Sequence, residues 1–309
     1  MLRFILRRLI YGVITLWVLI TLTFIMMHNL PGDPFANSQK LSKEALAVLK
    51  KTYGLDQPIW VQYGSYLKKI VSFDFGISFN YPTRTVNEVL TQTFPTSAEL
   101  GMYAIIVAVL IGLTLGVIAA LNHNKTWDYV AMLTAIVGVA APALVIGPLL
   151  SYFIGVKLGW LPPALWKGPE YKILPTITLA FGTLATMARM MRTSMLDVVN
   201  QDYIKTARSK GLTKFAVVFK HTIRNAMLPI ITILGVAVVN ITTGAFVVEQ
   251  IFAVPGMGKF FVQSITTNDY TMIMGMTIFY AALLIVAIMI TDVLYGLIDP
   301  RIRLSKGGK

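Results

Sequence analysis

The chain has 309 residues, of which 56% are hydrophobic and only 13% are charged, and its formal net charge is +13. A soluble globule of this length needs more polar surface than this composition supplies, so the sequence predicts an integral membrane protein. The sequence contains no cysteine, which excludes disulfides, thiol catalysis and thiolate metal sites.

Six apolar stretches are long enough to cross a membrane as helices, since a span needs about 20 mostly apolar residues. They are continuous rather than alternating, which is not the pattern of a membrane barrel. The stretches comprise residues 9–27, 100–121, 129–154, 173–190, 228–248 and 272–294. The predicted fold is therefore all-α and integral to the membrane, with six transmembrane helices. The first stretch resembles a secretory signal but is longer and lacks a small-x-small cleavage site, so we expect it to be retained.

Basic residues gather on one side of the predicted spans. If the N-terminus is cytoplasmic, the inner segments hold 16 of the 27 basic residues with five acidic ones, whereas the outer segments hold 11 with nine. Because Lys and Arg favour cytoplasmic loops, both termini are expected to be cytoplasmic. The charge is spread around membrane exits rather than along one soluble face, so no nucleic-acid partner is expected.

The outer segments are expected to be partly structured. Within residues 31–99, two stretches, 41–53 and 59–70, place apolar side chains on one stripe and predict amphipathic helices. We favour a small outer subdomain packed on the spans over a segment that handles substrate directly. The proline-rich loop 155–172 predicts a rigid connection without helix.

The fifth span is rich in small and polar residues, which favours close helix packing over pore lining. Glu249, at its outer end, is expected to be interfacial. The centres of the predicted spans lack Asp, Glu, Lys and Arg. This disfavours an ion-coupled secondary transporter, although carbonyl and hydroxyl sites for sodium remain an alternative.

No catalytic or metal motif is apparent in the sequence. His28, His123 and His221 are scattered without carboxylates at ligand spacing, and no nucleophile is accompanied by a base. Residues 255–260 carry Gly-Lys without the following Ser or Thr of a phosphate loop, and we interpret them as a turn. An integral-membrane enzyme is thus the least supported hypothesis, below a non-transporting scaffold.

A basic segment separates the fourth and fifth predicted spans, over residues 202–212 and 221–229. We expect a short helix that starts near Tyr203, is capped by Asn200 or Asp202, and is ended by Gly211 in the left-handed conformation. We call this basic segment the handle. A membrane protein that has such a segment and no catalytic groups of its own is expected to be bound there by a partner protein.

The side chains of this helix are expected to divide between two kinds of face. Ile204, Ala207 and Leu212 belong to the apolar face, and Lys205, Arg208 and Lys210 to the others. The small Ala207 and the terminal glycine would allow another protein to approach closely. The residues alone leave two hypotheses of equal weight, docking of a protein and a basic helix lying on anionic lipid.

This segment resembles the cytoplasmic signature of permease subunits of binding-protein-dependent ABC importers. The signature is Glu-Ala-Ala, three residues and then Gly; here Lys205-Thr206-Ala207 takes the place of the triplet, without the glutamate, and Gly211 follows. The peptide branch of that family commonly has Thr-Ala-x-x-Lys-Gly-Leu and His-x-x-x-Asn-Ala-x-x-Pro, which residues 206–212 and 221–229 match.

Further segments similar to the peptide branch recur along nearly the whole chain. They are residues 30–34, 53–58, 62–63, 73–78, 249–252, 255–258 and 299–300, whereas Asp-Tyr-Thr at 269–271 departs from the frequent Asp-Tyr-Pro. The likeness is greatest to the first permease subunit of oligopeptide importers, which has the long outer loop.

The resemblance implies a type I ABC importer permease fold in the bacterial cell membrane. Its parts would be an N-terminal transmembrane helix (1–30), a partly helical outer subdomain (31–99), a five-helix core (100–299) with a cytoplasmic coupling segment (192–226), and a cytoplasmic tail (300–309). The coupling helix, seated in a groove of an ATPase, would comprise Tyr203, Ile204, Lys205, Thr206, Ala207, Arg208, Ser209, Lys210 and Gly211.

The resemblance also implies partners and cargo. A second, similar permease, two cytoplasmic ATPase subunits and an extracytoplasmic peptide-binding protein would complete the complex in the lipid bilayer. This chain would be a non-catalytic transport subunit without a cofactor, and ATP and Mg would be bound by the ATPase subunits. Oligopeptides are the expected cargo, with dipeptides or nickel as the alternative within the family.

Overall fold

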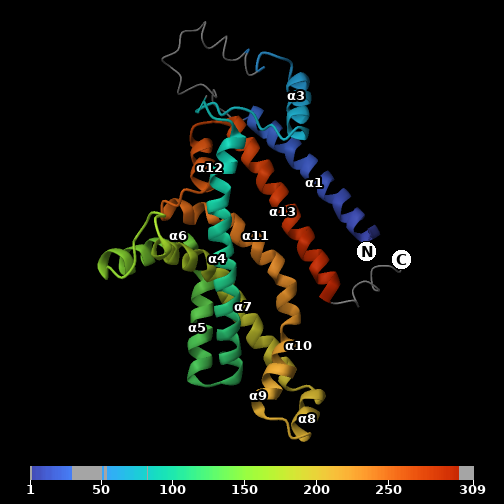
Figure 1. The fold of residues 1–309 in the computed structure, drawn as a ribbon, viewed down its shortest axis with the longest axis vertical. Coiled ribbons are helices and arrows are strands. Elements are labelled where there is room, and N and C mark those ends of the chain that lie inside the picture. The colour runs from blue at the N-terminus through green and yellow to red at the C-terminus, as the bar shows by residue number, and fades with distance from the viewer. Residues whose placement is uncertain (1, 30–50, 52–53, 82, 299–309) are drawn as a thin grey trace. The chain divides into compact units, whose positions relative to one another are not determined.

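The structure, a computed structural model, describes residues 2–29, 51, 54–81 and 83–298 (Figure 1). Helices make up most of these residues, and the strand pairing among them is one isolated antiparallel bridge between Ile77 and Thr85. The predicted all-α membrane fold is therefore confirmed. The chain divides into two compact units, Met1–Pro95 with Gly256–Val286 and Thr96–Pro255 with Ala287–Lys309.

Four helices in the described residues are long and apolar enough to cross a membrane: Ile5–Asn29, Val86–Leu121, Pro169–Val199 and Tyr270–Thr291. They correspond to the first, second, fourth and sixth predicted spans. A bent pair, Thr126–Ala140 with Ala143–Lys157, makes a fifth if it is counted as one span. The predicted fifth span lies in α11 (Leu228–Ile251). The total of six stays a prediction.

The first unit contains helices from both ends of the sequence. They are α1 (Leu2–Asn29), α3 (Ile59–Val71), the beginning of α4 (Val86–Leu121), α12 (Met257–Thr266) and the beginning of α13 (Tyr270–Ile298). The helix predicted over 59–70 is confirmed by α3, whereas the one predicted over 41–53 lies outside the described residues apart from Lys51. The turn expected over 255–260 is wrong from Met257 onward, where α12 begins after the extended Gly256.

The helix α3 packs on α1 through its aromatic side chains. The Tyr63 hydroxyl lies 2.7 Å from Thr21 Oγ1, and the rings of Tyr63 and Tyr66 lie 5.2 and 5.7 Å from that of Phe24. Trp60 is 81% exposed. Tyr63 and Tyr66, about one turn apart, thus anchor α3 to a predicted span.

The helix α4 begins at Val86, well before the predicted start at residue 100. Thr85 and Glu88 explain the early start. The Glu88 N–H donates to Thr85 Oγ1 at 3.1 Å, and the Thr85 N–H donates to Glu88 Oε2 at 3.0 Å. This reciprocal capping box satisfies two backbone donors that a helix end otherwise leaves unpaired.

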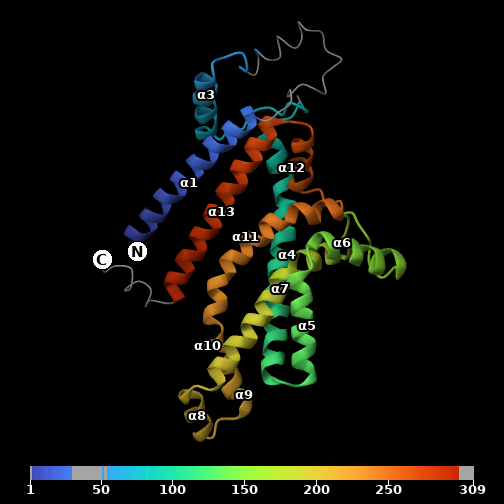
Figure 2. The same cartoon turned by 180° about the vertical axis from the view of Figure 1, so that it is seen from behind.

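The second unit is built around α7 (Pro169–Val199). It also contains α5 (Thr126–Ala140), α6 (Ala143–Leu150), η2 (Ser151–Lys157), α8 (Asp202–Ser209), α9 (Lys214–Ala216), η3 (Val217–Ile223), α10 (Arg224–Ala226) and α11. Twelve residues of α7 are buried, and seven of them belong to two apolar clusters. Figures 1 and 2 show α5 beside the second half of α4, and α8 with α9 at the C-terminal end of α7.

Close packing of α4 on α7 depends on two glycines one turn apart. A Cβ atom at Gly112 would lie 2.8 Å from the Leu184 carbonyl oxygen, and one at Gly116 would lie 2.5 Å from that of Ala188. Neither position has room for a side chain. Small residues four apart let the backbones of two membrane helices approach closely. Such close packing contributes to helix association in lipid, where burial of apolar surface does not drive the helices together.

The third predicted span is not one continuous helix. The chain turns by 112° between α5 and α6. Pro142 explains the break, because it has no N–H for the helical hydrogen bond and disfavours helical geometry at Ala141, whose backbone is extended. Non-helical backbone at membrane depth is tolerated where protein or a water-filled cavity covers it.

Two side chains of α11 show how it packs. A Cβ atom at Gly235 would overlap Thr291 of α13, which supports the packing role predicted for the small residues of this span. Glu249 is fully buried, and its expected place at the membrane interface stays a prediction. Val248 and Phe252, which flank it, belong to the buried core.

The loop between η2 and α7 is shorter than predicted. Residues 158–168 lie outside regular helix, whereas Lys157 and Pro169 are helical. The Leu165 N–H donates to the Phe252 carbonyl at 2.7 Å, and Ser151 Oγ donates to the Pro163 carbonyl, also at 2.7 Å. The loop is thus fixed to η2 and to the end of α11.

Candidate functional site

The predicted handle is a short helix, α8, with Lys210 as its C-cap residue and Gly211 following in the left-handed conformation at φ 77°. A Cβ atom at Gly211 would meet nothing within 4 Å. Glycine is therefore favoured here by backbone geometry rather than by lack of space.

The start of α8 differs from the prediction. Gln201 is the N-cap residue and makes no side-chain capping hydrogen bond. The Asn200 amide instead donates to the Leu196 carbonyl at 3.1 Å, and Asp202 pairs with Lys205 at 2.9 Å. Asp202 lies in the first turn, where a negative charge interacts favourably with the helix dipole.

One face of α8 packs on the chain itself. Ile204 and Ala207 are 0% and 6% exposed and form a small apolar cluster with Val217 of η3 and Val198 of α7. Ala207 is therefore not available to a partner, contrary to the role expected for it. Leu212 is 41% exposed and does not complete this face as predicted.

The opposite face of α8 is exposed and basic. Its exposed side chains are Tyr203, Lys205, Thr206, Arg208, Ser209 and Lys210. Within the described residues, Arg208 and Lys210 form no ion pair, and the sequence has no acidic residue between Asp202 and Glu249. The charge and polarity of this surface are complementary to an acidic or polar groove.

Two exposed aromatic side chains adjoin α8 and were not singled out from the sequence. Phe215 and Phe219 are 70% and 54% exposed, and their ring centroids lie 4.2 Å apart. Lys214 and Lys220 flank them and are also exposed. The four-residue spacing of the aromatics on a helical segment could have indicated this pair.

The chain returns from α8 to α11 through the other half of the sequence pattern, residues 221–229. The Asn225 amide donates to the His221 carbonyl at 2.6 Å, and Thr222 is buried. Pro229 occupies the first turn of α11, where its missing N–H leaves no helical bond unmade. These residues build the support of α8 rather than its exposed face.

A buried ion pair ties α7 to the first turn of α5. Asp128 is 2% exposed and accepts from Arg192 Nε at 2.5 Å and from Arg192 Nη2 at 2.8 Å. The Asn124 N–H donates to the same carboxylate at 2.9 Å, and His123 Nδ1 lies 3.1 Å from Arg192 Nη2. The sequence showed Asp128 and Arg192 only as charges at membrane exits, since nothing in their spacing indicates that they meet.

The other end of α7 is also held by a charged side chain. Lys172 forms an ion pair with Glu99 of α4, and its ammonium lies 5.2 Å from the ring centroid of Trp166. Charged contacts therefore fix α7 near both ends, and the α8 handle follows directly after it.

A cavity of about 550 Å³ lies beside the middle of α7. Ala141 and Ala143, at the bend between α5 and α6, form part of its lining. Its lining is uncharged and comprises Ala141, Ala143, Ile146, Thr178, Leu179, Phe181, Gly182, Thr183, Thr186, Met187, Met190, Ile233 and Ala237. Hydroxyl groups and flexible methionines contact many shapes without selecting for charge.

Comparison with protein families identifies two matching regions. Residues 112–304 match the family described as binding-protein-dependent transport system inner membrane component, and residues 1–101 match the N-terminal region of such membrane components. Together the two matches cover nearly all of the chain.

Several characterised proteins are similar over their full length. The dipeptide transport system permease protein DppB of Bacillus subtilis is 46% identical over 308 residues, covering 100% of both chains. The oligopeptide transport system permease proteins OppB of Salmonella typhimurium and Escherichia coli are 44% and 42% identical, covering 98% of this chain and 100% of each relative.

Two solved structures share the fold. An amino acid ABC transporter is 22% identical with a TM-score of 0.51, covering 69% of this chain and 93% of that one. The MetNI methionine ABC transporter, in an inward-facing conformation, is 14% identical with a TM-score of 0.55, covering 68% and 96%.

Proposed function

Because the chain belongs to the binding-protein-dependent transport system inner membrane component family, we propose that it is one half of the membrane pore of an ATP-driven peptide importer. Full-length identity of 41 to 46% with oligopeptide and dipeptide permeases is the observation that carries this proposal. Oligopeptides are the proposed cargo, and dipeptides are the alternative that the Bacillus subtilis relative supports.

The proposed complex contains a second, similar permease, two cytoplasmic ATPase subunits and an extracytoplasmic peptide-binding protein. ATP and Mg belong to the ATPases, and this chain acts as a non-catalytic transport subunit. Both of its termini and the α8 handle face the cytoplasm in this proposal, since basic residues favour that side.

The exposed face of α8 is the proposed contact with an ATPase subunit. Residues 203–211 are the proposed coupling helix, and the structure supports two different roles among them. Ile204 and Ala207 fix the helix to η3 and α7, whereas Tyr203, Lys205, Arg208 and Lys210 are exposed to the partner. The ATPase can shift the pore between its two conformations only if the ATPase binds one conformation of the pore more tightly than the other.

The uncharged cavity beside α7 is the proposed part of the peptide path in this chain. A path that admits peptides of varied sequence benefits from a lining that does not select by charge. The broken helix at Pro142 supports this placement, because non-helical backbone at membrane depth is tolerated where it lines a cavity.

The test is uptake of a labelled oligopeptide into proteoliposomes that contain the whole complex. The variant carries Arg208→Glu with Lys210→Glu, and the matched control carries Lys125→Glu in the α4–α5 turn, another exposed basic residue on the same predicted side. We expect ATP-dependent uptake in the wild type and the control, and loss of uptake in the double variant.

Two other outcomes have clear meanings. Uptake that ignores ATP but follows an ion gradient would contradict the proposed function. Normal ATP-dependent uptake by the double variant would leave the importer intact and contradict the role of α8.

A further inference from the structure

The loop that follows α3, residues 72–77, presents an aromatic side chain on a strained backbone. Phe73 is 79% exposed, and its backbone is left-handed at φ 55°. Bulky residues adopt this conformation at a cost, and three residues further on the chain meets the same demand with Gly76, at φ 85°. Neither the strain nor the exposed ring favours the fold of the chain alone, and such positions are often functional.

Hydrogen bonds hold Phe73 in this conformation. The Asn87 amide, in the first turn of α4, donates to the Phe73 carbonyl at 2.6 Å, and its carbonyl accepts from the Phe75 N–H at 2.9 Å. Asp74 Oδ1 accepts from the Gly76 N–H, also at 2.9 Å. The backbone on both sides of the ring is therefore fixed, so the exposed ring is presented by a preorganised loop.

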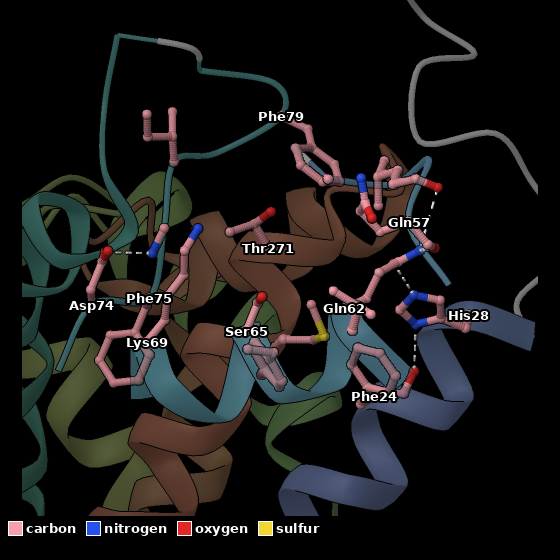
Figure 3. A pocket seen from close by; sticks show the side chains of 17 residues that line it. Phe24, His28, Gln57, Gln62, Ser65, Lys69, Asp74, Phe75, Phe79 and Thr271 are labelled. Atoms are coloured by element: carbon pink, nitrogen blue, oxygen red, sulfur yellow. Dashed lines mark hydrogen bonds between the residues drawn. The ribbon is translucent and has the colours of Figure 1, made fainter. Parts of the chain in front are cut away.

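Contacts with α1 indicate the depth of this loop in the membrane. Gln62 lies 2.9 Å from a ring nitrogen of His28, and the ring of Tyr66 lies 5.7 Å from that of Phe24. Figure 3 shows His28 bonded to Gln62 and to the Phe24 carbonyl. From Gln62 to Tyr66, α3 thus runs back along α1. Phe24 is three residues before the end of the apolar stretch 9–27, at most about 4.5 Å below the predicted membrane boundary at about 1.5 Å per residue.

The helix α13 indicates the same depth. A Cβ atom at Gly275 would lie 3.0 Å from Phe75 Cβ, so the loop packs directly on this turn of α13. Gly275 is three residues into the apolar stretch 272–294, which is again at most about 4.5 Å from the boundary. Figure 3 shows Phe24, Phe75 and Thr271 around one cavity of about 160 Å³. Two predicted spans therefore place the loop at the same membrane boundary.

The side chains around Phe73 suit this boundary. Val71 is 80% exposed, and Lys68 and Lys69, about one turn earlier on α3, are exposed and form no ion pair within the described residues. Exposed apolar side chains beside lysines are typical of segments at the border of acyl chains and headgroups, because the long lysine side chains reach the phosphates. At this depth lipid, rather than a partner protein from the water phase, meets the exposed surface.

We propose that residues 71–73 form a membrane anchor. Val71 and Phe73 insert among the acyl chains just below the headgroups, and Lys68 and Lys69 extend to the lipid phosphates. The leaflet is the outer one in the proposed orientation of the chain. The anchor fixes the end of α3, and the loop after it, to the bilayer surface. It concerns only this chain and the membrane, so it goes beyond the proposed function and does not depend on peptide import.

The test uses a fluorescent label at a single introduced cysteine, because the sequence contains no cysteine. Phe73→Cys is labelled with a nitrobenzoxadiazole group before the chain is combined with its partner subunits. The whole complex is then placed in nanodiscs of phosphatidylcholine with plain or brominated acyl chains, since bromine quenches a fluorophore that it contacts. We expect the label to lose at least about half of its emission in brominated lipid, because anchoring segments insert about 5 to 10 Å.

Asp56→Cys with the same label is the matched control. Asp56 is exposed and precedes α3, whose 13 residues make a helix about 20 Å long. The control position therefore lies at the end of α3 that points away from the bilayer, and its label should keep its emission in brominated lipid. Equal quenching at both positions would overturn the inference, because the label itself would then be entering the lipid.

A second pair of variants separates the lipid contact from a structural role of Phe73. The label is placed at Val71→Cys, and position 73 is changed to Leu or to Asn. Leucine keeps an apolar side chain, whereas asparagine accepts the left-handed backbone more readily but is polar. We expect quenching to persist in Phe73→Leu and to fall by at least about half in Phe73→Asn, because a polar side chain is costly among acyl chains.

Two further outcomes would overturn the anchor. One is equal quenching at Val71→Cys in the Phe73→Leu and Phe73→Asn variants. The other is a label at position 73 that brominated lipid does not quench but that added binding protein shields from aqueous iodide, which would assign the loop to a protein partner. None of these measurements uses ATP or peptide. Absence of ATP-dependent uptake in the wild-type complex would contradict the proposed function and leave the anchor unaffected.

Discussion

Gly211 ends α8 in a backbone conformation that other residues adopt at a cost of about 1 to 2 kcal/mol. Gly211→Val should therefore shift the end of α8 and reorient Arg208 and Lys210. We expect ATP-dependent peptide uptake to fall at least about tenfold, the factor that 1.4 kcal/mol of lost coupling corresponds to, while the chain still assembles in the membrane. Uptake and assembly are measured in the same proteoliposomes.

Gly159 offers a matched control for this substitution. It has a similar φ of 64° and nothing within 4 Å of an added Cβ atom, but it lies in the loop between η2 and α7. Gly159→Val should bear a similar local strain without loss of uptake. An equal loss in both variants would indicate general destabilisation and contradict a specific role for Gly211.

The Asp128–Arg192 pair makes a prediction about stability. Arg192→Met leaves the Asp128 carboxylate buried without its partner, and we expect the free energy of unfolding in detergent to fall by about 3 kcal/mol. The double variant Asp128→Leu with Arg192→Met should recover most of this loss, because two apolar side chains then replace two buried charges.

The more exposed pair of Glu99 and Lys172 serves as the comparison. Its side chains are 35% and 27% exposed, so Glu99→Gln should change the free energy of unfolding by about 1 kcal/mol or less. Equal losses at both pairs would show that burial does not determine the strength of these contacts.

At the scale of elements, the packing of α4 on α7 should depend on Gly116. Alanine is preferred over glycine in helices by about 1 kcal/mol, so Gly→Ala stabilises where space allows. Gly101→Ala should be neutral or stabilising, because its Cβ would lie 3.8 Å from Ile241. Gly116→Ala should destabilise by about 1 to 3 kcal/mol, since its Cβ would overlap the Ala188 carbonyl. Thermal unfolding of both variants in detergent distinguishes the two cases, and stabilisation by Gly116→Ala would contradict close packing.

Apolar runs could be predicted as spans because hydrocarbon requires about 20 apolar residues with every backbone group paired. The position of α8 and its glycine end could be predicted for similarly local reasons, namely capping and backbone geometry. The early start of α4 is local as well, because Thr85 and Glu88 have the spacing of a capping box.

Other features depend on contacts between residues far apart in the sequence. The burial of Ala207 requires Val217 to lie over it, and the pairing of Asp128 with Arg192 requires α5 and α7 to be neighbours. The break at Pro142 was masked by an apolar run long enough to suggest one helix. Composition predicts that a segment is buried in a membrane but not which of its faces meets the protein.

At the scale of the whole molecule, the uncharged cavity beside α7 makes a prediction about cargo. Thr186 lines this cavity and makes only a local hydrogen bond to the Gly182 carbonyl, at 3.0 Å. Thr186→Asp would place one negative charge in the proposed path. We expect uptake of lysine-containing peptides to rise relative to glutamate-containing peptides by about tenfold, the factor that 1.4 kcal/mol of charge interaction corresponds to.

Thr114 of α4 is the control, because it makes the same kind of hydrogen bond, to the Leu110 carbonyl at 2.7 Å, and does not line the cavity. Thr114→Asp introduces the same charge into a span and should change the amount of assembled complex without changing the ratio of the two uptakes. The ratio of the two uptakes does not depend on how much complex is reconstituted. It therefore distinguishes a residue that contacts the peptide from one at which a charge only lowers assembly. An unchanged ratio in Thr186→Asp would place the peptide path elsewhere. An equal shift of the ratio in both variants would show that the shift comes from the electrostatic potential of the whole pore rather than from this cavity.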